Sequence, residues 1–146
     1  MQIEIKIDSS CKETKVIVVT DKMDEEVHQI IKKLSEENSG MIAGFRNDTL
    51  ELLDPQRMIR IYASGGKVYA VTEDGEYTLR LRLYEMEERL DKSCFVRISN
   101  SEIINLKKVK SFDLSFSGTI CVSLSGGTVT YVSRRYVARI RKVLGI

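Results

Sequence analysis

Three short clusters of basic and polar residues are the part of this sequence best suited to chemistry. Arginine can hold a guanine edge or a phosphate with two donors at once, and asparagine can do the same for adenine. Serine hydroxyls and the free backbone N–H groups at a helix start suit phosphate oxygens. These residue types therefore point to contacts with nucleic acid. The clusters are Ser64-Gly65-Gly66-Lys67, Arg97-Ile98-Ser99-Asn100-Ser101 and Ser133-Arg134-Arg135-Tyr136, the last continued by Arg139, Arg141 and Lys142.

Charge is distributed unevenly along the 146 residues, although the net charge is only +2. Residues 1–55 hold 7 Lys/Arg and 12 Asp/Glu, a balance of −5, and residues 56–91 hold 6 and 7, a balance of −1. Residues 92–146 hold 10 and 2, a balance of +8, and contain two of the three clusters. A folded block this basic favours a polyanion as its partner. A solvated basic surface is the alternative that charge alone leaves open.

Side chains suited to catalysis or metal binding are sparse. The only histidine, His28, has no second histidine or cysteine near it, and Cys11, Cys94 and Cys121 form no CxxC pair. We interpret the cysteines as free thiols in a reducing cytosol. The glycine pairs follow the pattern of turns rather than of phosphate loops. The sequence therefore predicts no enzyme, no catalytic residue, no metal, no cofactor and no small-molecule substrate.

The sequence also gives no sign of a membrane or a secretion signal. No apolar run approaches the roughly 20 residues that span a membrane, and the alternating start Met1-Gln2-Ile3-Glu4-Ile5-Lys6 is unlike a signal peptide. With 42% hydrophobic and 30% charged residues, the composition is that of an ordinary globular protein. We expect a cytoplasmic protein without a membrane partner.

The first 40 residues predict a strand, a second strand and a helix. Ile3, Ile5 and Ile7 alternate with polar residues, which is the period of a half-buried strand. Residues 15–20 form a β-branched run typical of a strand, and Asn38-Ser39-Gly40 ends the helix. Asp21 or Asp24 can cap that helix, whose apolar stripe is Val27, Ile30, Ile31 and Leu34.

From Met41 onward the sequence predicts short strands joined by tight turns. The pair Asp74-Gly75 is a hairpin signal, residues 83–90 predict a short helix, and Ser133 caps a final helix. The fold class is therefore mainly β, or α+β, with an antiparallel domain in residues 41–146 after a strand–strand–helix extension in residues 1–40. The predicted strands are 41–45, 49–53, 58–63, 67–72, 76–81, 95–98, 109–115, 119–124 and 128–132.

Residues 42–146 resemble the LytTR family of bacterial DNA-binding domains. The motif from Phe95 to Ser101, which contains an arginine, a serine and an asparagine, is the most specific part of the resemblance. The motif from Ser133 to Tyr136 is the second most specific part. The remaining pieces keep the family's order and spacing: Ile59-Arg60-Ile61-Tyr62-Ala63, Val68-Tyr69-Ala70-Val71-Thr72, Leu83-Tyr84-Glu85-Met86-Glu87-Glu88-Arg89-Leu90 and Ile103-Ile104-Asn105-Leu106.

The resemblance implies an elongated antiparallel β fold whose loops enter the major groove of double-stranded DNA. Family members commonly bind direct repeats in promoters as pairs, which implies a transcription regulator that is a homodimer at least on DNA. Carried over by position, Lys67, Asn100 and Arg135 lie in the three reading loops. Arg97 would support the second loop or touch phosphate, and Asn105 would organise a backbone turn. The candidate DNA-binding residues are Lys67, Arg97, Ser99, Asn100, Ser133, Arg134, Arg135, Arg139 and Lys142.

Several positions depart from the family pattern. Ser99 and Asn100 stand where members often carry histidine and then arginine, and Lys67 stands where an acidic or amide residue is common. Glu102 occupies a place that is usually aromatic or apolar, and its carboxylate would repel a phosphate nearby. These differences bear on the target sequence more than on the activity.

About 40 residues precede the resemblance, too few for the receiver domain that many relatives carry. We expect the acidic extension to pack, dimerise or bind a partner, or simply to cap the β region. Two other functions stay open at this point. The chain could control another protein through its N-terminal helix. It could also bind single-stranded RNA, a mode that favours exposed aromatic residues, although only 7% of its residues are aromatic.

Overall fold

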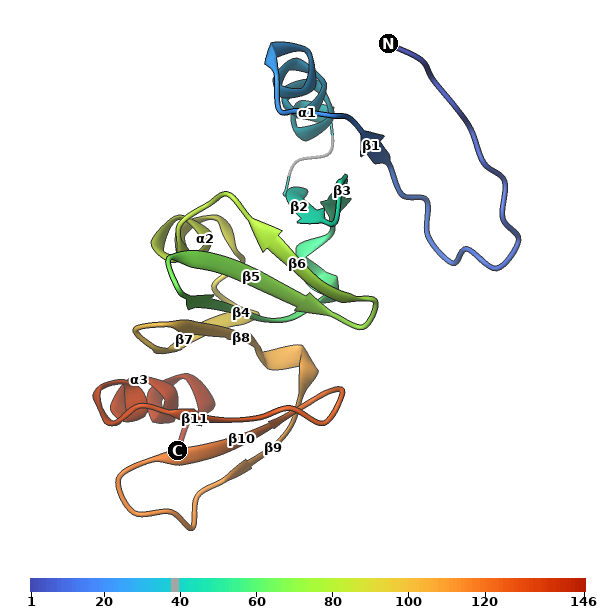
Figure 1. Cartoon of the computed structure of the whole chain (residues 1–146). Coiled ribbons are helices and arrows are strands. Elements are labelled where there is room, and N and C mark those ends of the chain that lie inside the picture. Colours follow the sequence, from blue (N-terminus) through green and yellow to red (C-terminus); the bar gives the residue numbers. More distant parts are fainter. Residues whose placement is uncertain (38–39) are drawn as a thin grey trace.

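The computed structural model of the chain describes residues 1–37 and 40–146. These residues contain three helices and eleven strands, and the strands form two antiparallel sheets (Figure 1). None of these helices is long and apolar enough to cross a membrane. The elements are β1 (Ile17–Val19), α1 (Glu25–Glu37), β2 (Ile42–Arg46), β3 (Thr49–Leu53), β4 (Met58–Ser64), β5 (Lys67–Thr72), β6 (Gly75–Leu79), α2 (Leu83–Arg89), β7 (Phe95–Ser99), β8 (Glu102–Asn105), β9 (Val109–Asp113), β10 (Ile120–Leu124), β11 (Val129–Val132) and α3 (Arg134–Leu144), with 3₁₀ turns at Pro55–Arg57 and Leu106–Lys108.

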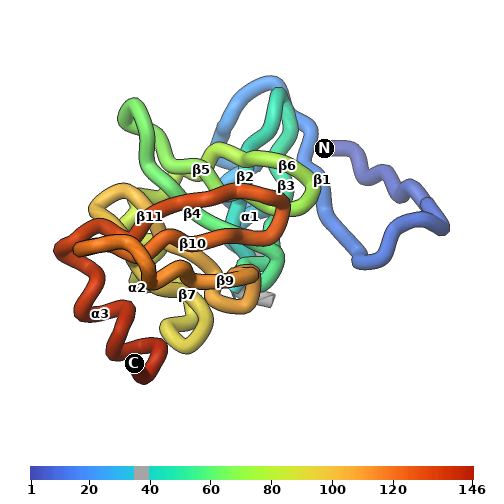
Figure 2. The backbone as a smooth tube through the Cα atoms, turned by 90° about the horizontal axis from the view of Figure 1, so that it is seen from below, coloured from blue at the N-terminus to red at the C-terminus, as the bar shows by residue number. Residues whose placement is uncertain are grey.

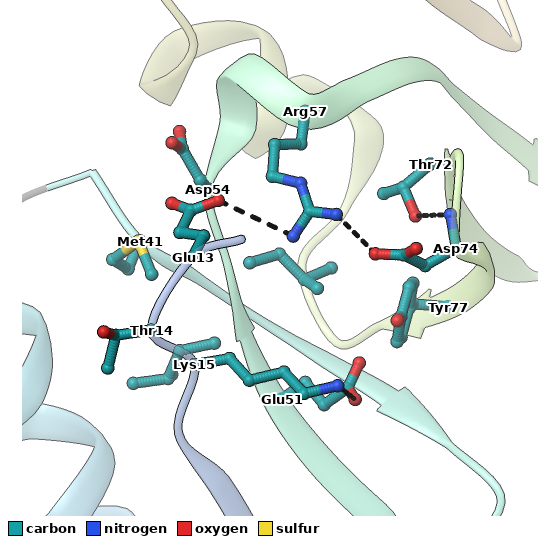
Figure 3. A pocket seen from close by; sticks show the side chains of 12 residues that line it. Glu13, Thr14, Lys15, Met41, Glu51, Asp54, Arg57, Thr72, Asp74 and Tyr77 are labelled. Carbon is teal, nitrogen blue, oxygen red and sulfur yellow. Dashed lines mark hydrogen bonds and ion pairs between the residues drawn. The ribbon is translucent and has the colours of Figure 1, made fainter. Parts of the chain in front are cut away.

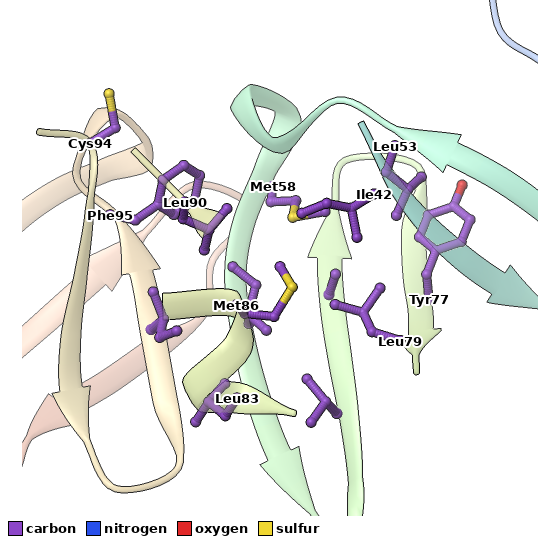
Figure 4. Packing of buried hydrophobic residues seen from close by; sticks show 14 residues of the cluster. Ile42, Leu53, Met58, Tyr77, Leu79, Leu83, Met86, Leu90, Cys94 and Phe95 are labelled. Carbon is purple, nitrogen blue, oxygen red and sulfur yellow. The ribbon is translucent and has the colours of Figure 1, made fainter. Parts of the chain in front are cut away.

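The larger sheet has eight strands in the order β1-β3-β2-β6-β5-β4-β8-β7. The helix α2 packs on one face of this sheet, where Met86 meets Met58 and Ile61 in a closed apolar core (Figure 4). All three side chains are 0% exposed. Burial of these side chains fixes α2 against the middle of the sheet.

A second core lies on the opposite face of β4, β7 and β8, under the smaller sheet β11-β10-β9 and α3. The strand β8 is buried on both faces, because Ile103 joins the first core while its neighbour Ile104 joins the second. The sequence of a strand that is buried on both faces does not alternate between polar and apolar residues. Because alternation is the pattern that predicts a strand, the sequence did not predict β8. The second core consists of Ile59, Val96, Ile98, Ile104, Ile120, Val122, Leu124, Val132 and Ile140.

A third, smaller core joins α1 to β1, β2 and β3. Three of the four residues in the predicted stripe of α1 join this core: Val27 is buried with Leu50 and Leu52, and Ile31 and Leu34 pack against them. The fourth, Ile30, is not part of it. Asp24 caps this helix as predicted, because its Oδ1 accepts a hydrogen bond from the Val27 N–H at 3.1 Å. The predicted end of the helix at Asn38-Ser39 lies outside the described residues.

The prediction of a strand at Ile3, Ile5 and Ile7 is wrong in this structure. These side chains are 82%, 84% and 94% exposed, and the described chain forms no strand before β1. Alternation shows that a segment can bury one face in a sheet, but a neighbouring strand must also accept it.

A buried amide, Asn105, lies at the end of β8, before the 3₁₀ turn that leads into β9. Its side chain is 0% exposed. Its Nδ2 donates to the Met58 carbonyl at 2.9 Å and to the Gln56 carbonyl at 3.4 Å, and its Oδ1 accepts from the Lys107 N–H at 3.0 Å. The amide therefore caps the 3₁₀ turn that leads from β8 into β9, as the sequence predicted for this residue.

Replacing this amide should destabilise the whole domain. Asn105→Ala leaves the Met58 carbonyl and the Lys107 N–H without their partner, so we expect the free energy of unfolding to fall by about 2–3 kcal/mol. Urea denaturation followed by circular dichroism measures it. The matched control is Asn100→Ala, at an exposed asparagine, which should change stability by no more than about 0.5 kcal/mol. Equal losses in the two variants would contradict the role of Asn105.

Candidate nucleic-acid interface

The three predicted clusters lie at one side of the molecule. They occupy the turn between β4 and β5, the turn between β7 and β8, and the start of α3, all on the left in both Figure 1 and Figure 2. We call residues 64–67, 99–101 and 133–136 together the basic edge. Two contacts join its parts: the Ala63 N–H donates to the Ser101 carbonyl at 2.8 Å, and the Tyr136 hydroxyl donates to Asn100 Oδ1 at 3.1 Å. The structure therefore brings together residues that are far apart in the chain.

The first turn presents its backbone and Lys67 to solvent. Gly65 and Gly66 both have positive φ, 58° and 78°, which is the backbone of a two-residue hairpin turn and strongly favours glycine. A Cβ at either glycine would have no described heavy atom within 4 Å. Lys67 follows as the first residue of β5 and is exposed. A bulky partner can therefore approach this turn closely.

The second turn is held from within by Arg97. Its Nε donates to the Ser99 carbonyl at 2.8 Å and its Nη2 to the Asn100 carbonyl at 2.5 Å. Its Nη1 lies 3.6 Å from Glu87 Oε2. The guanidinium is thus engaged by its own turn and by α2, which favours the supporting role among the two that the sequence allowed. Ser99 acts similarly, since its Oγ accepts from the Ser101 N–H at 3.2 Å.

Asn100 is the exposed residue of this turn, and Tyr136 orients it. The tyrosine hydroxyl donates to Asn100 Oδ1, so the Nδ2 of the amide is the atom left to face a partner. Oδ1 keeps a second lone pair, and the amide can still both donate and accept. Sequence reasoning named Tyr136 only as the last residue of a motif. Its role depends on a contact with a residue 36 positions away.

The start of α3 concentrates positive charge. Arg134 and Arg135 are exposed in its first turn, which contains no acidic residue. The helix dipole disfavours cations there and favours anions, by about 0.3–1 kcal/mol per charge at an exposed helix end, so a bound anion would offset this unfavourable placement. Ser133 occupies the N-cap position, but its side chain makes no capping hydrogen bond, contrary to our expectation. Its backbone N–H instead donates to the Ile98 carbonyl at 2.9 Å.

The rest of α3 separates a basic face from an apolar face. Arg139 and Lys142 are exposed and follow Arg135 at helical spacing, as predicted. Ile140 is buried in the second core, and Tyr136 packs against that core. Arg134 turns toward the loop between β9 and β10, where its Nε would lie 3.4 Å from a Cβ at Gly118. Basic side chains therefore project from α3 in more than one direction, while its apolar face packs on the second core.

Glu102 does not face the basic edge, which corrects the expected repulsion of phosphate. It is 7% exposed and lies beneath the edge. Its Oε2 is 2.7 Å from Arg60 Nε, as an ion pair rather than an aligned hydrogen bond, and its Oε1 accepts from the Thr130 hydroxyl at 2.7 Å. The Arg60 guanidinium also lies over the Tyr62 ring, 4.3 Å from its centre. The carboxylate is thus neutralised inside the protein.

A hollow with several charged side chains lies far from the basic edge, between residues 13–15 and the larger sheet (Figure 3). Its cations are paired: Arg57 contacts Asp74 and lies 3.7 Å from Glu13 Oε2, and Lys15 Nζ lies 3.9 Å from Glu51 Oε1. Burial and a hydrogen bond to Glu51 raise the pKa of Tyr77 to about 12. Four acidic and two basic side chains line this hollow, so it is unlike a polyanion site.

Comparison with known proteins agrees with the geometry. Residues 48–145 match the family described as LytTr DNA-binding domain. Two relatives from Staphylococcus aureus, of strains NCTC 8325 / PS 47 and MRSA252, are described as uncharacterized HTH-type transcriptional regulators, and each is 29% identical over 147 residues, covering 100% of this chain and 99% of the relative. The solved LytTr DNA-binding domain of a Bacillus cereus protein, described as a methyl-accepting/DNA response regulator, has a TM-score of 0.70 and 25% identity, covering 73% of this chain and 97% of that one. This similarity confirms the predicted mainly β fold.

The ion pair beneath the edge should contribute measurably to stability. We expect a double-mutant cycle of Arg60→Met and Glu102→Gln to give a coupling energy of about 1–3 kcal/mol, because removing one partner leaves a buried charge uncompensated. Thermal and urea unfolding of the four proteins measure it. The control is the same cycle at the ion pair of Lys108 and Glu73, in which Nζ lies 3.8 Å from Oε1 and the Glu73 side chain is 67% exposed. Its coupling energy should be no more than about 0.5 kcal/mol. A coupling near zero at Arg60 and Glu102 would refute this role.

Proposed function

Since the chain belongs to the family of LytTr DNA-binding domains, and is a DNA-binding transcription regulator rather than an enzyme, we propose that it reads duplex DNA through the basic edge. The observation that carries the proposal is the contact between Asn100 and Tyr136, which couples the second turn to the start of α3. Together with the exposed Lys67 beside them, these turns form one continuous surface. A surface of this kind suits several neighbouring base pairs.

Three exposed side chains are proposed to read bases. Lys67 and Arg135 can donate to the O6 and N7 atoms of guanine, and Asn100 can pair with the N6 and N7 atoms of adenine in the major groove. Each comes from a different turn of the basic edge. Arg97 and Ser99 are proposed to shape the second turn rather than to contact bases, because their polar atoms are already engaged.

Phosphate contacts are proposed for the remaining cations. Arg134 sits at a helix start together with the free backbone N–H groups that bind anions, beside the N-cap residue Ser133. Arg139 and Lys142 continue the positive charge along α3. Such contacts release counterions from the duplex, so binding should weaken with rising salt.

The mode of reading follows from the fold. The described residues contain no pair of adjacent helices joined by a turn, since five strands separate α2 from α3. The chain is therefore proposed to bind with hairpin turns and one helix start. From the family resemblance, we propose that pairs of the chain occupy direct repeats in promoters, in the cytoplasm where bacterial DNA lies. Tyr62 and Tyr69 stack on each other with ring centres 5.1 Å apart, and the Arg60 guanidinium lies over Tyr62, so these two rings are already engaged and do not favour stacking on RNA bases.

Loss of a base contact should weaken specific binding. We expect Asn100→Ala, Arg135→Ala and Lys67→Ala each to reduce affinity for the preferred duplex by about 1–3 kcal/mol, or roughly 5- to 150-fold. The duplex is first obtained by selection from random sequences, and fluorescence anisotropy measures affinity. The control is Lys33→Ala, which removes an exposed positive charge on α1 and should leave affinity unchanged.

Base and phosphate contacts can be separated in the same assay. Arg139→Ala should weaken all duplexes alike and lower the salt dependence, whereas Asn100→Ala should relax sequence preference. Wild-type affinity in both Asn100→Ala and Arg135→Ala would defeat the site assignment. Equal retention on single-stranded RNA, or none on any duplex, would defeat the proposed function.

The hydroxyl that orients Asn100 should matter on its own. We expect Tyr136→Phe to keep the fold and to weaken specific binding by about 0.5–1.5 kcal/mol, since it removes one hydrogen bond that fixes the amide. Anisotropy titration with the selected duplex measures it. Tyr84→Phe is the matched control, because Tyr84 is 60% exposed on α2. If both variants bind like the wild type, Tyr136 does not position Asn100.

A further inference from the structure

We propose that residues 2–7 form a β-strand that pairs with the free edge of β1 in a second copy of the chain. The proposal concerns the side of the molecule opposite the basic edge. It does not rest on DNA binding, and it is tested without DNA.

The donated segment has the pattern of a strand but no neighbour. Ile3, Ile5 and Ile7 are 82–94% exposed. Gln2, Glu4 and Lys6 alternate with them, so a strand over these residues would gather the three isoleucines on one face. Half of the exposed large apolar side chains in the described chain, 7 of 14, fall within its first 19 residues. Such a concentration in a monomer indicates an interaction surface.

The accepting edge belongs to β1. This strand is the outermost of the larger sheet and pairs only with β3 among the described strands, so its other side presents free backbone groups. Ile17 and Val19 are 45% and 79% exposed, while Val18 between them packs toward α1. An exposed apolar edge is a template for another strand. At the far end of the sheet, by contrast, β7 is covered by α3 and β11.

The segment is held away from its own β1. Arg57 pairs with Glu13, and Lys15 pairs with the buried Glu51, so residues 13–15 are fixed on the sheet (Figure 3). A turn precedes them, where the Cys11 N–H donates to the Asp8 carbonyl at 3.1 Å. The Met1 amino group ends 3.8 Å from Glu26 Oε1 on α1. The chain therefore reverses direction without pairing, and the isoleucines stay available to a second copy.

A second copy fits both features at once. It supplies an edge whose exposed side chains, Ile17 and Val19, match the isoleucine face of the donated strand. Residues 8–16 connect that strand to its body, and nine residues reach at most about 30 Å. Because the N-terminal segment and the basic edge lie on opposite sides (Figure 1), two copies joined in this way keep both basic edges open. The pairing links two DNA-binding bodies without using any residue of the basic edge.

The first test measures the oligomeric state of the full chain by sedimentation equilibrium. We expect a reversible dimer in the micromolar range, and Ile5→Lys should raise its dissociation constant at least tenfold. Gln2→Lys adds the same charge on the polar face and should change it less than twofold. Circular dichroism verifies that both variants are folded. A monomer at every concentration, or a dimer that Ile5→Lys leaves intact, would overturn the proposal.

The second test identifies the partner strand by cross-linking. In a Cys11→Ser, Cys121→Ser background, one sample carries Ile5→Cys and another carries Val19→Cys, and a short bismaleimide is added to each alone and to their mixture. A cross-linked dimer specific to the mixture supports exchange between copies. A third sample carries Ile5→Cys and Val19→Cys in one chain. No cross-linked dimer in the mixture would overturn the proposal. So would a cross-link that forms in the third sample only within one chain, because the segment then folds back on its own β1.

Discussion

A buried carboxylate, Glu102, links the two sheets directly beneath the basic edge. It lies on β8 between Arg60 of β4 and Thr130 of β11, so one side chain contacts both sheets. An unpaired charge at this depth would cost several kcal/mol, and the three strands must therefore come together as a unit. Asn100 precedes Glu102 by two residues. The position of the second turn is thus tied to the packing of the whole domain.

This arrangement explains how three distant segments act as one surface. The backbone contact from Ala63 to Ser101 joins the first turn to the second, and the contact from Tyr136 to Asn100 joins the second to α3. Arg97 fills the second turn from inside, through its hydrogen bonds to the carbonyls of Ser99 and Asn100. Two arginines at a helix start oppose the helix dipole, and the proposed phosphate contacts would offset that unfavourable interaction.

The sequence predicted the elements that follow a regular pattern and missed those that depend on a distant partner. Strands with alternating polar and apolar residues, and glycine turns such as Gly65-Gly66, could be predicted from the sequence. Both the alternation and the need for a positive φ are properties of a short segment. The strand β8 was not, since its burial on both faces comes from two cores. The sequence predicted that Glu102 would repel phosphate, because the residues next to it in the chain do not indicate its contacts with Arg60 and Thr130. The isoleucine alternation of residues 3–7 predicted a half-buried strand, although no described strand of the same chain accepts it.

The separation of charge along the chain becomes a separation in space. The basic residues 92–146 supply the second turn and the start of α3 in the basic edge, whereas α1, which begins with Glu25 and Glu26, lies at the top of the molecule, away from α3 (Figure 1). In the proposed binding mode, we expect a duplex to attract the basic edge and to repel the acidic N-terminal residues, since both carry net charge of known sign. The proposed pairing of N-terminal segments would then be compatible with an occupied basic edge.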